Sequence, residues 1–130
     1  MDITIDTSAI IAVITNEPSK IRLVELTVGV GLCSPRSIHW EIGNAFSAML
    51  KRQRITLRQA QACIKTYQDL PITFVDVDLE KTLALVGQLN IYAYDAYLIE
   101  CARQTGTPLL TLDKGLINAA KLAGIQILGL

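Results

Sequence analysis

Hydrophobic residues along this chain follow two alternating patterns. Short, mainly β-branched runs, such as residues 3–5 and 72–75, predict buried strands. Longer segments in which apolar residues recur every three or four positions predict helices between them. The predicted strands cover residues 3–5, 29–34, 72–75, 108–112 and 125–128, and the predicted helices cover 9–15, 20–27, 35–52, 57–69, 79–89, 95–104 and 116–122. This alternation predicts an α/β fold with a central parallel sheet of four to five strands and helices on both faces.

Polar residues mark the ends of several of these helices. Ser34 followed by Pro35 predicts an N-cap with proline at the first helical position. Thr56 and Gln59 have the spacing of a capping box. Asn90 is placed to end the helix 79–89 in a left-handed conformation. The segments between the predicted elements are short. The chain has no linker or internal repeat that would divide it into domains.

Length and composition narrow the class of protein. At 130 residues the chain is one domain that buries a core without disulfides. Its three cysteines are odd in number and lie in apolar runs, so we expect reduced thiols in a cytoplasmic protein. We expect no signal peptide and no membrane span, since no apolar run reaches the roughly 18 residues required. A hydrophobic content of 51% with a mean hydropathy of +0.37 indicates that part of the surface forms an interface.

Three acidic residues are predicted near the carboxyl edge of the sheet. Asp6 and Asp113 end strands, and Asp95 opens a helix. Ligand sites of open α/β sheets form at that edge. Each acid also has a local explanation: a strand-end hydrogen-bonding motif for Asp6, an N-cap for Asp95 and an Asx turn for Asp113.

Glu41 is a fourth candidate, inside the helix predicted over 35–52. At about 100° per residue, Glu41 and Asn44 share one helical face, so a carboxylate and an amide project side by side. Glu41 lies between Trp40 and Ile42, which is unusual for a solvated acid. The alternative is that Glu41 belongs to the exposed polar stripe of its helix.

These four segments resemble the signature of PIN domains. The segments are Asp6-Thr-Ser-Ala, Glu41 with Asn44-Ala45, Tyr94-Asp-Ala-Tyr and Thr111-Leu-Asp113. By length and order of elements, the whole chain, residues 1–130, resembles the single-domain VapC-type toxins of bacterial toxin–antitoxin pairs.

The resemblance implies a metal-dependent endoribonuclease. It would be inhibited by a cognate VapB-type antitoxin and would form a homodimer, with RNA as its substrate. The metal ligands and catalytic residues implied by the resemblance are Asp6, Glu41, Asp95 and Asp113, and the nearby polar support is Thr7, Ser8 and Asn44. Oxygen ligands of this kind suit Mg²⁺ or Mn²⁺, whereas zinc would require histidine or cysteine.

A basic run that follows Glu41 along the chain is the candidate surface for binding the RNA backbone. It consists of Lys51, Arg52, Arg54 and Arg58. The alternative is that these cations complement a helix dipole and are simply solvated. Aromatic residues are 5% of the chain, which argues against a base-stacking platform. Tyr92, Tyr94 and Tyr97 flank Asp95 and could contact a nucleotide, but packing against the protein is the favoured expectation.

Two other functions compete with the nuclease. A receiver-like signalling module is also a small α/β fold with acids at strand ends, but it requires two adjacent acids where Asp6 is followed by Thr7. A catalytically silent PIN domain that only binds RNA or protein is the other. A metal-free ribonuclease usually needs two histidines, and the chain has one, His39, which is predicted to point away from Glu41.

Overall fold

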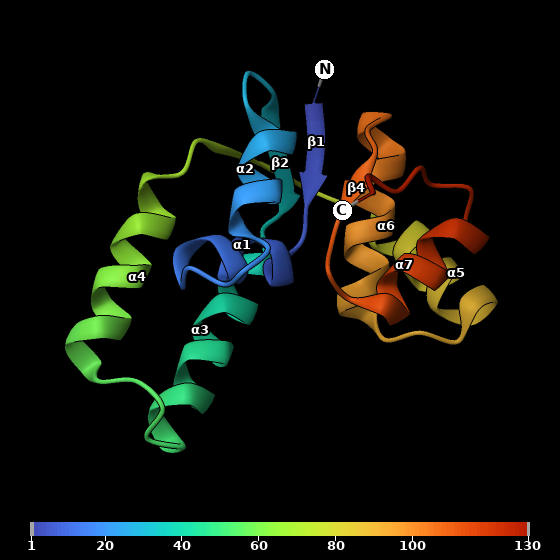
Figure 1. The fold of residues 1–130 in the computed structure, drawn as a ribbon. Helices are drawn as coiled ribbons and strands as arrows, with labels where there is room; N and C mark the ends of the chain where they lie inside the picture. Colours follow the sequence, from blue (N-terminus) through green and yellow to red (C-terminus); the bar gives the residue numbers. More distant parts are fainter. Residues whose placement is uncertain (1, 130) are drawn as a thin grey trace.

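A computed structural model of the chain, which describes residues 2–129, contains a four-stranded parallel sheet with helices on both faces (Figure 1). The strands are β1 (Asp2–Ile5), β2 (Gly31–Pro35), β3 (Ile72–Val75) and β4 (Leu109–Leu110), in the order β3-β2-β1-β4. All three neighbouring pairs are parallel. The predicted α/β class and parallel sheet are thus confirmed.

Helices form two groups on either side of the sheet (Figure 1). Along the chain they are α1 (Thr7–Ile14), α2 (Lys20–Thr27), α3 (Ser37–Lys51), α4 (Leu57–Asp69), α5 (Leu79–Leu89), α6 (Ala93–Thr105) and α7 (Lys114–Leu122). On one side α1 packs against α2, α3 and α4. On the other side α6 packs against the sheet and against α5.

The order of the strands places a crevice beside β1. From β1 the chain proceeds through β2 to β3 in one direction, and β4 then returns to the opposite side of β1. The connections after β1 and β4 therefore diverge, which opens a crevice at their carboxyl ends. Ligands of open parallel sheets bind at such a reversal of strand order. Asp6 directly follows β1, and Asp113 follows β4 by three residues.

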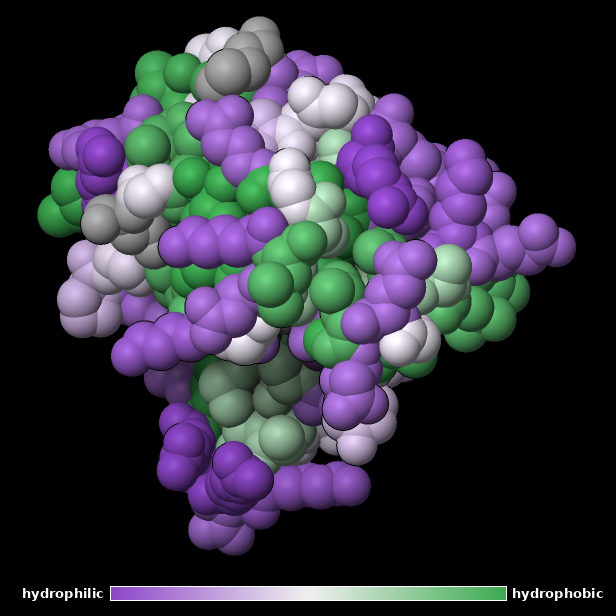
Figure 2. Space-filling view, turned by 90° about the vertical axis from the view of Figure 1, so that its right-hand side faces the viewer, coloured by the Kyte–Doolittle hydropathy of each residue, from purple (hydrophilic) through white to green (hydrophobic). Residues whose placement is uncertain are grey.

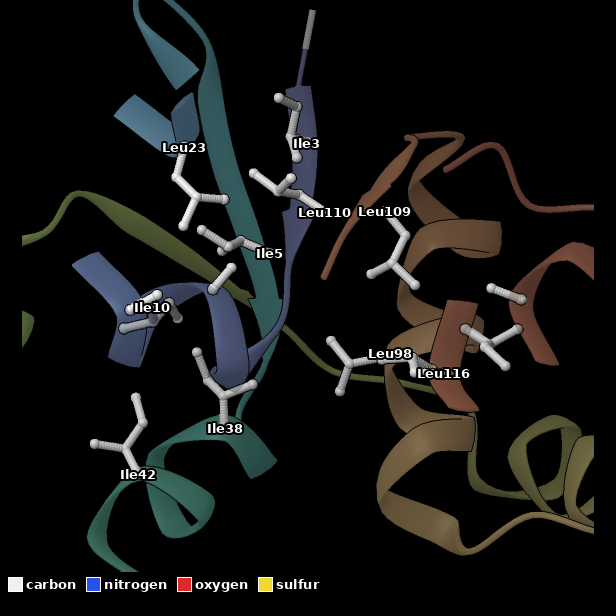
Figure 3. Packing of buried hydrophobic residues seen from close by; sticks show 14 of the residues in the cluster. Ile3, Ile5, Ile10, Leu23, Ile38, Ile42, Leu98, Leu109, Leu110 and Leu116 are labelled. Carbon is white, nitrogen blue, oxygen red and sulfur yellow. The ribbon is translucent and has the colours of Figure 1, made fainter. Parts of the chain in front are cut away.

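The hydrophobic core fills both sides of the sheet (Figure 3). Ile5 and Leu23 lie on the side of α1 and α2, together with Ile10 and with Ile38 of α3. Leu98, Leu109 and Leu116 lie on the opposite side, toward α6 and α7 (Figure 3). The sheet is covered on both faces, which explains why β1 and β2 bury consecutive residues rather than alternate ones.

Two sequence predictions about elements need correction. The predicted helical start at Ser34-Pro35 is wrong, because both residues belong to β2 and α3 begins at Ser37. The Ser34 hydroxyl donates to the carbonyl of Ile5 across the sheet and is not available as a cap. Pro35 is the last strand residue and pairs only with β3, so its missing N–H interrupts no ladder.

The C-terminal strand predicted over 125–128 is reduced to one parallel bridge, between Leu109 and Ile127. Leu109 N donates to the Gln126 carbonyl at 2.9 Å, and Leu128 N donates to the Leu109 carbonyl at 3.0 Å. β4 is itself only two residues long, not five as predicted, so it supports no longer ladder.

Other local predictions hold. The capping box of Thr56 and Gln59 is present, and Asn90 ends α5 in the left-handed region. Cys33 and Cys101 are free and buried. Within residues 2–129, no helix has the length and apolar character needed to cross a membrane.

Candidate active site

Asp6 accepts more hydrogen bonds than the other three acids. It is buried, and it caps α1 by accepting a hydrogen bond from Thr7 N at 2.7 Å through Oδ1. Its Oδ2 accepts from Ser8 Oγ at 2.8 Å and from Thr111 Oγ1 at 2.7 Å. A carboxylate has about four acceptor positions, so three donors leave one position, on Oδ1, for a ligand.

Thr111 is a site residue that the sequence prediction missed. Its side chain is 1% exposed, and its hydroxyl accepts from Asp113 N at 3.0 Å while donating to Asp6. Ser8 does the same with Leu112 N, at 3.0 Å. These two hydroxyls tie the loop after β4 to the Asp6 carboxylate. The signal available in the sequence was a hydroxyl residue two positions before Asp113 in a buried strand.

Glu41 projects from α3 toward Asp6. Thr7 Oγ1 donates to Glu41 Oε2 at 3.1 Å. The neighbouring residue Ser8 donates to Asp6, so adjacent hydroxyls contact the two acids. Burial raises the pKa of Glu41 to about 7; the Thr7 hydrogen bond opposes this, and the charges of Asp6 and Asp95 add to it. Glu41 is half-buried, so the exposed-stripe alternative does not apply.

Asn44 lies one turn after Glu41 on the same face of α3. Both residues line a hollow of about 300 Å³ together with Thr7, Trp40, Ala45 and Tyr94. The predicted pairing of carboxylate and amide is therefore present, and it opens onto a space large enough for part of a small ligand.

Asp95 enters the crevice from the other side of the sheet. It lies in the first turn of α6, whose N-cap is Tyr92, so the N-cap alternative for Asp95 is wrong. Burial raises the pKa of Asp95, and the charges of Asp113 and Asp6 raise it further. The positive end of α6 favours an anion at this position.

Asp113 is the N-cap of α7 and is exposed. Its Oδ1 accepts from Gly115 N at 2.9 Å and from Leu116 N at 3.2 Å, so the predicted Asx turn is present. Asp113 caps α7 and also lies near the site, because its charge raises the pKa of Asp95. The four acids thus form one electrostatically linked group around the end of β1.

The acids are close but not converged. Among residues 2–129, no three His, Cys, Asp or Glu side chains are arranged closely enough to hold a metal ion as they stand. Like charges in this group raise the pKa of Glu41 and of Asp95, so the acids repel one another in the absence of a cation. The set supplies only oxygen donors and excess negative charge, which is the chemistry that a hard divalent cation neutralises.

The basic run does not join this group. Lys51 and Arg52 end α3, Arg54 lies in the loop to α4 and Arg58 lies in the first turn of α4, and all four are exposed. Ten residues of helix separate Glu41 from Lys51, a distance of about 15 Å along the axis.

His39 lies away from the acids. Its Nδ1 is 3.3 Å from Tyr67 Oη of α4, and its ring contacts Trp40 edge-on. The site therefore contains carboxylates, hydroxyls and an amide, without the imidazole pair of a metal-free ribonuclease.

The aromatic residues near the acids differ from the prediction that they pack against the protein. Tyr92 is 88% exposed and Tyr94 is 51% exposed. Trp40, next to Glu41, is 68% exposed. Only Tyr97 is half-buried, with its ring edge-on to Tyr94. Trp40 lies near the start of α3 and Tyr92 and Tyr94 lie at the start of α6, where no other element within the described residues covers their rings.

A parallel α/β domain with four acids gathered at the reversal of its strand order is a candidate metal-dependent hydrolase of anionic substrates. The chain belongs to the PIN domain family, whose model matches residues 3–122. The match confirms the predicted resemblance to PIN domains and rules out the receiver-like alternative.

Solved structures share the fold at low sequence identity. PAE2754 from Pyrobaculum aerophilum matches with a TM-score of 0.73 and 21% identity, over 92% of this chain and 79% of that one. VapBC2 from Rickettsia felis, bound to a DNA fragment from its promoter, gives 0.69 and 16%, over 98% of both chains. VapC20 from Mycobacterium tuberculosis, a toxin that cleaves the sarcin-ricin loop, gives 0.65 and 15%, over 91% of this chain and 95% of that one. No curated protein matches the chain significantly.

Proposed function

We propose that this protein is a metal-dependent endoribonuclease, a toxin of the VapC type, that hydrolyses phosphodiester bonds of RNA. The observation that carries the proposal is the linked group of Asp6, Glu41, Asp95 and Asp113 at the crevice beside β1. PIN domains are typically metal-dependent nucleases, and this chain has an acid at each position of the signature.

Mg²⁺ or Mn²⁺ would be held by the four acids. When bound, the ion would lower the pKa of a water molecule and stabilise negative charge on the phosphate, which leaves products with a 5′-phosphate. The hydroxyls of Ser8 and Thr111 fix the Asp6 carboxylate, and the Thr7 hydroxyl orients Glu41. Asn44 lines the same hollow as Glu41 and supplies an amide that can bind a phosphate oxygen.

The basic run of Lys51, Arg52, Arg54 and Arg58 is proposed to bind the RNA backbone at a distance from the cleavage point. Lys51, the first residue of the run, lies about 15 Å from Glu41 along α3, a separation that a single RNA strand can span. If the charges of Arg52 and Arg54 are reversed, RNA affinity and its salt dependence should both fall.

A cognate antitoxin of the VapB type and a homodimer are proposed as partners. Support comes from the likeness to VapBC2 and from exposed hydrophobic side chains on several helices, namely Ile21, Val28, Leu57, Leu79, Leu83 and Leu122. Figure 2 shows one side of the molecule as hydrophobic surface interrupted by hydrophilic side chains. A small upstream gene for a DNA-binding protein would support the antitoxin, and light scattering of the purified chain would test the dimer.

The reaction is tested with purified protein and end-labelled total RNA in Mg²⁺, Mn²⁺ or EDTA. The matched variants are Asp6→Asn at the site and Asp69→Asn at the exposed end of α4. We expect metal-dependent cleavage that leaves 5′-phosphates, is lost in Asp6→Asn and persists in Asp69→Asn.

Two results would contradict the proposed reaction. Cleavage that survives both EDTA and Asp6→Asn would mean that the acids do not perform it. Metal-independent RNA binding without any cleavage would favour the catalytically silent PIN domain.

A further inference from the structure

Trp40 is an exposed indole beside the candidate active site. It is the single tryptophan of the chain, is 68% exposed and immediately precedes Glu41 in α3. The buried face of α3 is provided by Ile38, Ile42 and Phe46, so Trp40 contributes little to the core. Its ring is perpendicular to the His39 ring, with centroids 5.0 Å apart, so that neighbour covers at most one of the two faces of the indole.

Trp40 and Tyr94 stand between two hollows. The first, of about 300 Å³, contains Glu41 and Asn44. The second, of about 350 Å³, is lined by the same two rings and by Arg36, Ser37 and Asp76, among others. Trp40 precedes Glu41 and Tyr94 precedes Asp95, so each ring is adjacent in sequence to an acid of the site. A ligand that extends from the acids into the second hollow must pass the two rings.

Ser37, which lines the second hollow, carries an unsatisfied polar atom. Ser37 Oγ is buried and has no hydrogen-bond partner among residues 2–129. A buried hydroxyl without a partner costs free energy comparable to a lost hydrogen bond, so such groups usually contact a ligand or water. Ser37 Oγ has almost no accessible surface, so it reaches a ligand in the second hollow only when its side chain rotates toward that ligand.

Arg36 supplies the positive charge at the far wall. Its only ion pair within the described residues is an exposed one with Asp76 at 3.4 Å, and exposed pairs of this kind are weak. The guanidinium carbon lies 5.9 Å from the centre of the Phe74 ring. The exposed Arg36 guanidinium can therefore exchange Asp76 for a phosphate group.

We propose that Trp40 and Tyr94 form a nucleobase subsite, in which an unpaired base next to the cleaved phosphate of RNA stacks on the Trp40 ring. The Ser37 hydroxyl rotates into the hollow to bind the edge of that base, and Arg36 binds the following phosphate. This proposal rests on the proposed RNA cleavage at the neighbouring acids. Base stacking on exposed aromatic rings is the common means of binding single strands.

Binding is tested with the full chain in EDTA, which prevents metal-dependent cleavage. Because Trp40 is the only tryptophan, its fluorescence reports on its own surroundings. We expect a short oligoadenylate to quench this emission and inorganic polyphosphate to leave it unchanged. Trp40→Leu should weaken oligoadenylate binding, followed by the anisotropy of labelled RNA, about tenfold or more, while Trp40→Phe retains most of the affinity.

Matched controls separate stacking from general effects. Tyr92→Leu removes an exposed ring that lines neither hollow, and it should leave affinity unchanged. Arg36→Gln should reduce the slope of log affinity against log salt by about 0.7, the value for one phosphate contact to a single strand. Arg22→Gln, which removes an exposed arginine paired with Glu25 at 3.4 Å, should leave that slope unchanged.

Three results would overturn the subsite: RNA binding without quenching and with normal affinity in Trp40→Leu, equal losses in Trp40→Leu and Tyr92→Leu, or no RNA binding by the wild-type chain. The cleavage assay with total RNA then shows whether the ribonuclease proposal fails as well. Metal-dependent cleavage that is normal in Trp40→Leu would overturn the subsite alone. In that case a change of oligomeric state in Trp40→Leu would identify the ring as a protein contact.

Discussion

Asp6 shows how one residue serves both the fold and the candidate site. It caps α1 and receives two side-chain hydroxyls, so its orientation is fixed before any ligand arrives. Glu41 differs, because one hydroxyl contacts it and burial opposes its charge. The group therefore combines a rigid acid with an acid whose protonation responds to its surroundings.

Thr111→Val should destabilise the protein by about 1.5–3 kcal/mol, the range for hydrogen bonds to charged groups. Valine has the shape of threonine, but it removes the donor to Asp6 Oδ2 and the acceptor for Asp113 N. Urea denaturation measures the change. Thr73→Val, at an exposed position of β3, is the control and should change stability by less than about 0.5 kcal/mol. Equal effects at both positions would contradict a specific role for Thr111.

Glu41 predicts a distinct pH dependence of stability in the metal-free protein. Its folded pKa is about 7, above the ordinary value of 4.5, so between these values the folded state retains a proton that the unfolded state releases. The free energy of unfolding should therefore fall as pH rises from about 4.5 to 7, by at most about 1.4 kcal/mol per pH unit for one proton.

Glu41→Gln should remove this contribution, and urea denaturation across the pH series in EDTA measures it. The exposed Glu80→Gln is the control and should retain the wild-type slope. A slope that is the same in Glu41→Gln and in the wild type would show that Glu41 ionises normally.

At the scale of elements, α3 connects the core to the candidate site. The helical period places Ile38 and Ile42 against the core, while Glu41 and Asn44 face the hollow beside Asp6. The same helix begins beside Arg36 and ends at the basic run, so its length separates the two cationic groups. Helix ends position the remaining acids, with Asp95 in the first turn of α6 and Asp113 at the N-cap of α7.

Two glycines have opposite effects on helix stability, one at the end of α6 and one inside α5. Gly106 ends α6 at φ +66°, and an added Cβ would meet no atom within 4 Å, so the backbone alone requires glycine there. Gly106→Ala should cost about 1–2 kcal/mol. Gly87 has the same free space but lies inside α5, so Gly87→Ala should stabilise the protein by about 0.5–1 kcal/mol. Thermal unfolding compares the two, and the same sign for both would contradict this account.

For the whole molecule, the sheet order brings negative charge from four separate segments together. Asp6 follows β1, Glu41 lies on α3, and Asp95 and Asp113 lie at the starts of α6 and α7. α3 lies on one side of the sheet and α6 and α7 lie on the other (Figure 1), so the charges of these acids link the two sides. A divalent cation in that crevice would link both halves of the fold.

Mg²⁺ or Mn²⁺ should therefore raise the melting temperature. The expected gain is about 2.7 kcal/mol at a metal concentration about 100 times the Kd. Asp95→Asn should reduce this gain and leave the metal-free protein unchanged or more stable, because it removes one of the repelling charges. Circular dichroism at constant ionic strength measures both, with Na⁺ in place of the divalent ion as the control. A less stable metal-free Asp95→Asn variant would contradict the repulsion.

The sequence by itself determined the elements and the position of most candidate residues within them, because periodicity and capping are local properties. It placed Asp6 at a strand end, Asp113 in an Asx turn and Glu41 beside Asn44 on one face of α3. It missed what depends on distant partners. Whether Ser34 caps a helix or contacts Ile5 across the sheet is not a local property.

Only the tertiary structure decided that β4 lies beside β1. This pairing joins residues about a hundred positions apart, and it alone brings Thr111 to Asp6 and forms the crevice. Tertiary packing also decided which rings stay exposed, since the sequence does not show that nothing covers Trp40 and Tyr94. Composition argued against a stacking surface, yet two exposed rings beside an acid site suffice for one base. Local interactions fix the helices and strands, whereas the site arises from long-range packing that no short segment encodes.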